Sequence, residues 1–207
     1  MAAQPSTGGP TIFDVNSGFA LGPAGLHNIY EDGNGRPVPH ETFSADEYSF
    51  YEGVISRLKA EVEREFGLMS LWFTAPTFIT RLVGNESWSP ATMHDQYWMT
   101  HVDKNNTEHY DYSGLLYLSE HGADFEGGLL TFYDPDDEVT PVLEVAPRPG
   151  RIALFSSDVE NPHAVNLVTS GRRLTLSFWF TCSKENEFLN FLDGKVHQRF
   201  GNTEAGG

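Results

Sequence analysis

Three side chains in two separated segments have the chemistry of a metal site. His101 and Asp103 are one residue apart, and His163 lies far along the chain. In an extended segment, side chains two positions apart point the same way, so an imidazole and a carboxylate at this spacing can bind one ion. Two histidines and one carboxylate form a facial triad, which leaves coordination positions open and suits oxygen chemistry at non-haem Fe(II). Zinc hydrolases use the same ligand types, so the triad alone does not decide the metal.

A second His-x-Asp pair, formed by His109 and Asp111, competes for the same role. It lies in a polar stretch just before a predicted strand, where a surface or turn histidine is the ordinary interpretation. His101 instead follows the apolar and aromatic run 97–99 and precedes a polar loop. A ligand pair at the end of a strand would lie in this setting, so we favour His101 and Asp103 over the second pair.

A predicted strand over residues 173–181 carries a charged residue that needs an anionic partner. Strand side chains alternate between two faces, so the apolar residues share one face and the other face holds Arg173, Thr175, Ser177 and Trp179. A guanidinium on an otherwise buried strand is costly unless it meets an anion. We expect Arg173 to bind the far carboxylate of a small dicarboxylate whose near end lies at the metal. Taken singly, Arg173 fits a salt bridge and His163 an ordinary interior histidine; together with His101 and Asp103 they favour a site.

Length and charge exclude several classes of protein. The chain has 207 residues, enough for one domain with a substantial core. Its formal net charge of −16 argues against a nucleic-acid partner, which needs clustered Lys and Arg. The single cysteine, Cys182, excludes an internal disulfide and a cysteine metal cluster. It lies in a β-rich run, where we expect a small buried side chain.

Targeting signals are not evident in this stretch of chain. No apolar run approaches the roughly 20 residues of a membrane span, and the first ten residues lack the apolar centre of a secretory signal. We therefore expect no membrane span here and a soluble chain, and we assign no compartment.

The chain divides into an arm, one domain and a tail. Residues 1–40 are dense in glycine and proline and predict an irregular arm. A single domain is expected over residues 41–200, with its core at about 70–182, followed by a loose tail at 201–207. Apolar residues at helical spacing predict a supporting helix over 44–66 that covers the apolar face of the strand 173–181. A short C-terminal helix is expected at 184–192.

Between the two helices the pattern is that of a mainly β protein. Short β-rich runs separated by Gly, Pro and Asp turns are typical of a sandwich or jelly roll. The predicted strands are residues 70–83, 113–119, 128–134, 141–145, 151–155, 163–168 and 173–181.

Several short motifs in one order resemble a known enzyme family. After His-x-Asp come the sequence Tyr-Leu-Ser at 117–119, the glycine pair 127–128, Pro-x-x-Gly-Arg at 147–151, Asn-Pro-His-x-Val at 161–165 and Arg-x-Thr at 173–175. This pattern, which covers about residues 70–182, resembles the 2-oxoglutarate and Fe(II)-dependent dioxygenases of the prolyl 4-hydroxylase-like branch. Many prolyl hydroxylases have Tyr three residues before the first ligand histidine, where this chain has Trp98.

The resemblance implies a fold, a ligand set and a reaction. It implies a double-stranded β-helix, or jelly roll, with Fe(II) bound by His101, Asp103 and His163. It implies that Arg173 binds the far carboxylate of the co-substrate 2-oxoglutarate, with Thr175 and Tyr117 beside it. Taken singly, Thr175 is an ordinary strand residue and Tyr117 a core aromatic. The further substrate is O2, and the family admits ascorbate as an additional cofactor.

The implied reaction is hydroxylation of an unactivated C–H bond by a dioxygenase. The resemblance points to a peptide or protein substrate, with proline as the residue suggested by analogy, coupled to decarboxylation of 2-oxoglutarate to succinate and CO2. Two alternatives stay open at this point. One is a non-catalytic β-helix that binds a peptide; the other is a zinc hydrolase, in which Arg173 has no required role.

Overall fold

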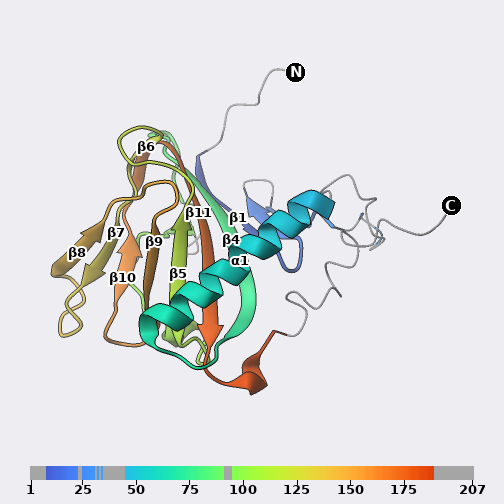
Figure 1. Ribbon diagram of the computed structural model, residues 1–207. Coiled ribbons are helices and arrows are strands. Elements are labelled where there is room, and N and C mark those ends of the chain that lie inside the picture. Colours follow the sequence, from blue (N-terminus) through green and yellow to red (C-terminus); the bar gives the residue numbers. More distant parts are fainter. Residues whose placement is uncertain are drawn as a thin grey trace.

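A computed structural model describes residues 8–22, 25–30, 32, 34, 45–90 and 95–188 (Figure 1). These residues form two antiparallel sheets, one long helix and two short helical turns. The mainly β prediction and the jelly-roll architecture are confirmed. Among the described residues, no helix combines the length and apolarity needed to cross a membrane.

The larger sheet is built around one long strand. β11 (Val168–Thr181) lies between β4 (Trp72–Val83) and β5 (Tyr112–Tyr117), and β5 pairs in turn with β9 (Ile152–Ser156). The first part of β11 also pairs with β6 (Phe125–Gly127). Every ladder is antiparallel, so strands that are distant in the sequence meet at β11.

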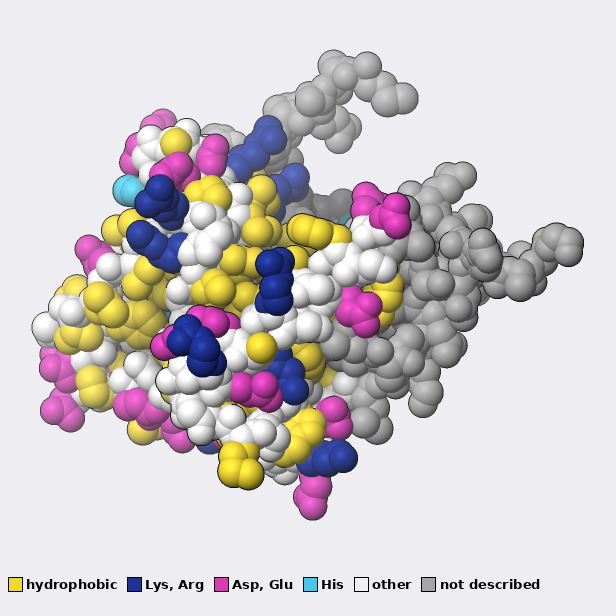
Figure 2. All heavy atoms as spheres, in the orientation of Figure 1, with side chains coloured by type: hydrophobic (Ala, Val, Ile, Leu, Met, Phe, Trp, Pro, Cys, Tyr) yellow, Lys and Arg dark blue, Asp and Glu magenta, His cyan; other side chains and the backbone are white. Residues whose placement is uncertain are grey.

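The smaller sheet has three strands in the order β10–β7–β8. They are β10 (His163–Val165), β7 (Leu130–Tyr133) and β8 (Pro141–Val145). Apolar side chains of β7 and β9 pack between the two sheets, where the rings of Phe132 and Phe155 meet edge to face at 5.0 Å. β8 is exposed, and Figure 2 shows apolar and acidic side chains intermixed on this part of the surface.

The helix α1 (Ala45–Phe66) covers the outer face of the larger sheet (Figure 1). One face of α1 buries three apolar side chains, Ile55, Leu58 and Val62. They pack against three side chains of β11, which are Leu176, Phe178 and Phe180. The alternation along β11 therefore directs its apolar face to the helix and leaves its other face to the interior between the sheets, as the sequence predicted.

The first forty residues contain strands that the sequence analysis missed. β1 (Gly9–Asp14), β2 (Phe19–Gly22) and β3 (Gly25–Asn28) extend the larger sheet beyond β4, so the prediction of an irregular arm was wrong for these residues. Glycine here serves the turns between short strands. Gly18 has φ +82°, and a Cβ there would lie 2.3 Å from the Tyr30 ring. The division into arm, domain and tail otherwise remains a prediction.

Two expectations near the C-terminus also need correction. The described part of the predicted helix 184–192 contains only a 3-10 turn, η2 (Lys184–Asn186), while 189–192 lie outside the described residues. Phe188 nevertheless packs against the cluster under α1. Cys182 is exposed rather than buried, because it follows the last residue of β11.

Two glycines, one in a crowded position under α1 and one in an open position on α1, give a matched pair of substitutions. A Cβ at Gly114 in β5 would lie 2.1 Å from Cε2 and 2.3 Å from Cζ of Phe178. Gly114→Ala should therefore lower the free energy of unfolding by roughly 1–3 kcal/mol, the usual effect of overpacking a core. Gly53 in α1 has open space around its Cα, so Gly53→Ala should raise the free energy of unfolding by about 0.5–1 kcal/mol.

Urea unfolding followed by circular dichroism measures both variants. Equal stability of Gly114→Ala and the wild-type protein would contradict the packing of β5 against β11 described here.

Candidate metal and dicarboxylate site

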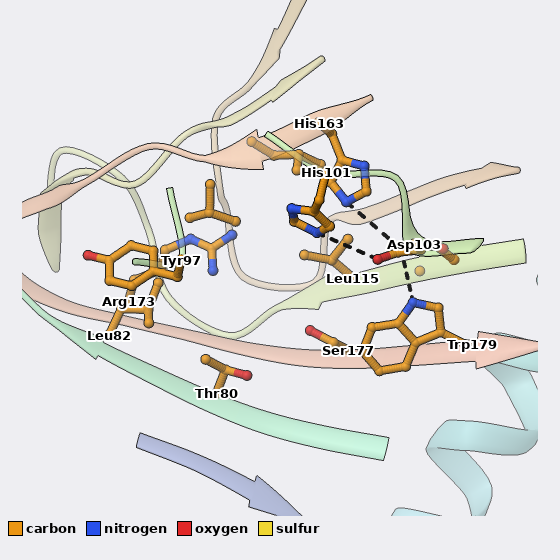
Figure 3. Close-up of a pocket in the computed structure, with 14 residues that line it drawn as sticks. Thr80, Leu82, Tyr97, His101, Asp103, Leu115, His163, Arg173, Ser177 and Trp179 are labelled. Carbon is orange, nitrogen blue, oxygen red and sulfur yellow. Dashed lines mark hydrogen bonds and ion pairs between the residues drawn. The ribbon is translucent and has the colours of Figure 1, made fainter. Parts of the chain in front are cut away.

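One cavity between the two sheets brings together residues that are far apart in the sequence. Its volume is about 200 Å³, and β4, β5, β7, β10, β11 and the segment 97–103 contribute its walls. Figure 3 shows the imidazole rings and Asp103 grouped at one end of the cavity and the Arg173 side chain at the other. The lining residues are Thr80, Leu82, Tyr97, His101, Asp103, Ser113, Gly114, Leu115, Leu130, His163, Val165, Arg173, Ser177 and Trp179.

The three predicted ligand side chains converge on one point. His101, Asp103 and His163 each offer a ligand atom, and these atoms lie within 4.8 Å of one another. His101 Nε2 is 3.6 Å from Asp103 Oδ1, and His163 Nε2 is 3.8 Å from Asp103 Oδ2. This donor set and spacing fit a single divalent ion with three protein ligands.

A pair of backbone hydrogen bonds fixes the two histidines relative to each other. The His101 amide donates to the His163 carbonyl, and the His163 amide donates to the His101 carbonyl, both at 2.9 Å. The segment 101–103 is thereby attached to the beginning of β10. The imidazole centroids lie 4.5 Å apart, as expected for side chains on paired backbone segments.

Backbone carbonyls also select the ring nitrogen that faces the cavity. Nδ1 of His101 lies 3.0 Å from the Met99 carbonyl, and Nδ1 of His163 lies 2.9 Å from the Asn161 carbonyl. A carbonyl only accepts, so each Nδ1 carries a proton, and Nε2 is the ring nitrogen that faces the cavity and is placed to bind a metal. Burial lowers the pKa of His163, which favours the neutral ring.

Asp103 is buried yet ionised. Burial raises the pKa of its carboxyl, but the nearby His101 and His163 and two hydrogen-bond donors outweigh this and hold the pKa at about 2. The two donors are Ser113 Oγ at 2.6 Å and Trp179 Nε1 at 2.9 Å. The carboxylate is therefore available as an anionic ligand at neutral pH.

At the other end of the cavity, Arg173 is a buried cation with one unused donor group. Its side chain is among the largest fully buried ones, with 2% of the residue exposed. Nε donates to the Gly128 carbonyl at 2.9 Å and Nη1 donates to Thr175 Oγ1 at 2.7 Å, whereas Nη2 has no partner. Burial lowers the pKa of Arg173, but a guanidinium keeps its proton in proteins. Among the described residues, no carboxylate forms an ion pair with Arg173.

Tyr117 adds a second unused polar atom beside Arg173. The residue is fully buried, and its hydroxyl has no hydrogen-bond partner. The Arg173 Cζ lies 5.4 Å from the centre of its ring. Burial raises the pKa of Tyr117, so the phenol is neutral and can donate. Two unpaired buried donors side by side are costly unless an acceptor joins them, and an anionic carboxylate fits this requirement.

The competing His-x-Asp pair lies outside this cluster. Asp111 accepts a hydrogen bond from the Cys182 amide at 2.7 Å and lies 3.1 Å from Lys104 Nζ. His109 packs against the ring of Tyr110. In the described part of the chain, the one group of His, Asp, Glu or Cys that meets the spacing of a metal site is His101, Asp103 and His163.

Some cavity residues were not singled out by the sequence analysis. Ser113 and Tyr97 line the cavity, and Trp179 donates directly to Asp103. The Tyr97 hydroxyl accepts a hydrogen bond from the Val168 amide at 3.0 Å, which closes the wall next to Arg173. Strand alternation placed Trp179 on the correct face, but no signal in the sequence indicated its partner.

Comparison with known proteins points to the same region. Residues 89–181 match the family model of the 2OG-Fe(II) oxygenase superfamily. The chain is 34% identical over 183 residues to 2-oxoglutarate and iron-dependent oxygenase domain-containing protein 3 of Xenopus tropicalis, covering 87% of this chain and 55% of that protein. It is 47% identical over 85 residues to human prolyl 3-hydroxylase 3, covering 41% of this chain and 11% of that protein.

A solved structure shows the same fold. It is a prolyl hydroxylase in complex with a hypoxia inducible factor oxygen degradation domain peptide fragment from Trichoplax adhaerens, with a TM-score of 0.50 and 16% identity over 87% of this chain and 86% of that one. The chain spans about half the length of the oxygenase domain-containing relative it matches. From these matches and the converging ligand set, the chain contains a region of the 2OG-Fe(II) oxygenase superfamily, matched by the family model over residues 89–181.

Proposed function

We propose that this protein is an Fe(II)- and 2-oxoglutarate-dependent dioxygenase that hydroxylates an unactivated C–H bond of a peptide or protein. The reaction is coupled to decarboxylation of 2-oxoglutarate to succinate and CO2. The superfamily implies Fe(II), 2-oxoglutarate and O2. The observation that carries the proposal is one cavity with a triad of metal-ligand type at one end and an unpaired buried guanidinium at the other.

At the metal end, the proposed ligands are His101, Asp103 and His163. The two histidines direct their Nε2 atoms at the site, and the carboxylate would neutralise part of the charge of a divalent ion. Bound Fe(II) supplies the oxidation chemistry, which no side chain can perform. The protein holds the ligands and orients the co-substrate in the cavity between the two sheets.

At the other end, Arg173, Thr175 and Tyr117 form the proposed binding site for the far carboxylate. Nη2 of Arg173 and Oη of Tyr117 each have a free proton, and the Thr175 hydroxyl accepts from Nη1 while keeping its own proton. A carboxylate has four lone-pair positions and can accept all these donors. An apolar or neutral ligand would leave the guanidinium unpaired, so the site favours a dicarboxylate.

The proposed macromolecular substrate is a peptide or protein segment. Relatives named prolyl 3-hydroxylase and a similar fold solved with a peptide fragment support this class of substrate. Proline is the first residue to test. Trp98 occupies the place where many prolyl hydroxylases have Tyr, and its ring contacts that of Tyr97. This difference argues against assigning proline from the resemblance alone. A role for ascorbate stays a prediction.

Two alternatives are separated by simple measurements. A zinc hydrolase gives no role to the buried Arg173, and metal analysis of the purified protein distinguishes zinc from iron. A peptide-binding domain without activity would form no succinate from 2-oxoglutarate in air with added Fe(II). The intact ligand set and the two unpaired donors favour the oxygenase over both.

Removing one ligand tests the metal assignment. His101→Ala leaves two of three ligands and should abolish succinate formation, measured aerobically with Fe(II) and 2-oxoglutarate. His109→Ala is the matched control and should keep wild-type activity, because His109 contacts Tyr110 and not the cavity. Loss of activity in His109→Ala, with activity retained in His101→Ala, would show that His109 and Asp111 form the metal site instead.

Replacing Arg173 tests the co-substrate assignment. Arg173→Lys keeps the charge but loses the planar fork, and the KM for 2-oxoglutarate should rise by about 10–100-fold, since charge-assisted hydrogen bonds contribute roughly 1.5–3 kcal/mol. Fe(II) affinity should stay near the wild-type value. Arg172→Ala, a change at the adjacent exposed arginine, is the control. Unchanged turnover of Arg173→Lys at low 2-oxoglutarate would refute the assignment.

Tyr117→Phe should have opposite effects on stability and binding. The hydroxyl is buried without a partner, so its removal should leave the free energy of unfolding without ligand unchanged or slightly higher. Affinity for 2-oxoglutarate should fall by about tenfold, since one hydrogen bond contributes roughly 1 kcal/mol. Thermal unfolding and calorimetric titration measure the two quantities. Equal co-substrate affinity in Tyr117→Phe would exclude Tyr117 from the site.

A further inference from the structure

The two oxygens of Asp103 have different surroundings. Oδ2 accepts from Ser113 Oγ at 2.6 Å and from Trp179 Nε1 at 2.9 Å. Oδ1 accepts no hydrogen bond from Ser113 or Trp179. Each oxygen lies near one ligand histidine, Oδ1 3.6 Å from His101 Nε2 and Oδ2 3.8 Å from His163 Nε2, so the difference between them is the two donors. A carboxylate oxygen has two lone-pair positions, so two donors occupy those of Oδ2. The lone pairs that remain for a metal are on Oδ1.

A chain of hydroxyl groups fixes the direction of the Ser113 bond. Ser113 Oγ also lies 2.7 Å from Ser157 Oγ. An ionised carboxylate cannot donate, so the single hydroxyl proton of Ser113 points to Asp103 and Ser157 must donate to Ser113. Both serines are buried, at 2% and 1% exposed, which keeps water from replacing either bond. Successive bonds of this kind strengthen one another.

Aromatic contacts on two sides fix the Trp179 indole. Its ring stacks on Tyr110 with centroids 5.3 Å apart and planes 16° apart, and it meets Phe78 edge to face at 5.7 Å. The indole nitrogen has one proton, which is directed at Asp103 (Figure 3). Tyr110, the central residue of the second His-x-Asp motif, thus supports the site through its stacking on Trp179.

We propose that Trp179 and Ser113, the latter backed by Ser157, are positioning residues that hold Asp103 Oδ2 and restrict Asp103 to ligation through Oδ1 alone. A carboxylate that bound through both oxygens would occupy one of the coordination positions that a facial triad leaves open. Those positions are needed for the co-substrate and O2. The inference rests on the proposed function, because it takes the triad as the metal site.

Metal titration tests the proposal without turnover. Trp179→Phe keeps the aromatic ring and removes the N–H; Ser113→Ala removes the hydroxyl. Each should weaken binding of Co(II), used as a spectroscopic probe, and of anaerobic Fe(II) by about 10–100-fold, the usual effect of losing a partner of a metal ligand. The visible absorption of bound Co(II) should change, since it reports coordination number. Ser157→Ala, which acts only through Ser113, should give a smaller loss.

Matched controls separate positioning from general destabilisation. Trp72→Phe and Thr181→Val change a tryptophan and a buried hydroxyl of the same sheet away from the ligands, and Thr181 Oγ1 bonds Asp111 instead. Both should bind Co(II) as the wild-type protein does. Thermal unfolding of each metal-free variant identifies any variant that does not fold. Trp179→Phe and Ser113→Ala change different strands, so if one of them fails to fold, the other still tests the proposal.

The outcomes distinguish this proposal from the proposed function. Wild-type binding of Co(II), with weaker binding and an altered spectrum in either variant, supports it. Wild-type affinity and an unaltered spectrum in the folded variants would overturn it and leave the oxygenase assignment intact. A wild-type protein that binds neither Co(II) nor Fe(II) would overturn both.

Discussion

The site depends on two hydrogen bonds between the backbones of His101 and His163. They attach a short segment before α2 (Asp103–Asn106) to the first residue of β10, two pieces of chain separated by the whole of β5 through β9. Once they form, the imidazole rings lie 4.5 Å apart and Asp103 lies beside both. On its other side, β10 pairs with β7 through the ladder that places His163 opposite Phe132, so His163 is held between the two.

Charge in the cavity is arranged in two separate places. Asp103, ionised and buried, lies with the histidines, while the guanidinium of Arg173 lies at the opposite end of the same cavity (Figure 3). Neither residue neutralises the other. Each buried charge is therefore incompletely compensated by protein alone, a costly arrangement that is typical of sites built to receive ions. A divalent cation at one end and an anionic carboxylate at the other would complete both.

The strand β11 runs along both the metal end and the Arg173 end of the cavity and connects them to the rest of the fold. One face of β11 holds Arg173, Ser177 and Trp179 in a row along the cavity, and its other face packs against α1. Side chains two residues apart on a strand keep a fixed spacing. The distance between the carboxylate-binding end and the metal end is thus set by the pitch of one strand, which is held on both sides by β4 and β5.

The residue pattern of the sequence was sufficient to predict features that depend on a single helix or strand. Alternation along residues 173–181 predicted which side chains face the interior, and helical spacing predicted α1, because each period reflects the geometry of a single element. The same reasoning failed for residues 9–28, where glycines that serve turns between short strands were taken for an irregular arm. It also failed for Cys182, since the residue at which a strand leaves the core depends on its neighbours.

The sequence by itself determined the set of residue types able to bind a metal and a dicarboxylate, their order, and the face on which Arg173 lies. It ranked His101 above His109 by context alone. Only the tertiary structure decided which atoms meet: the free Nε2 of each histidine, the two donors on one oxygen of Asp103, and the unpaired Nη2 beside the Tyr117 hydroxyl. The physical reason is that these contacts join strands that are distant in the chain, and the residue pattern within one strand does not specify which other strand it will pair with.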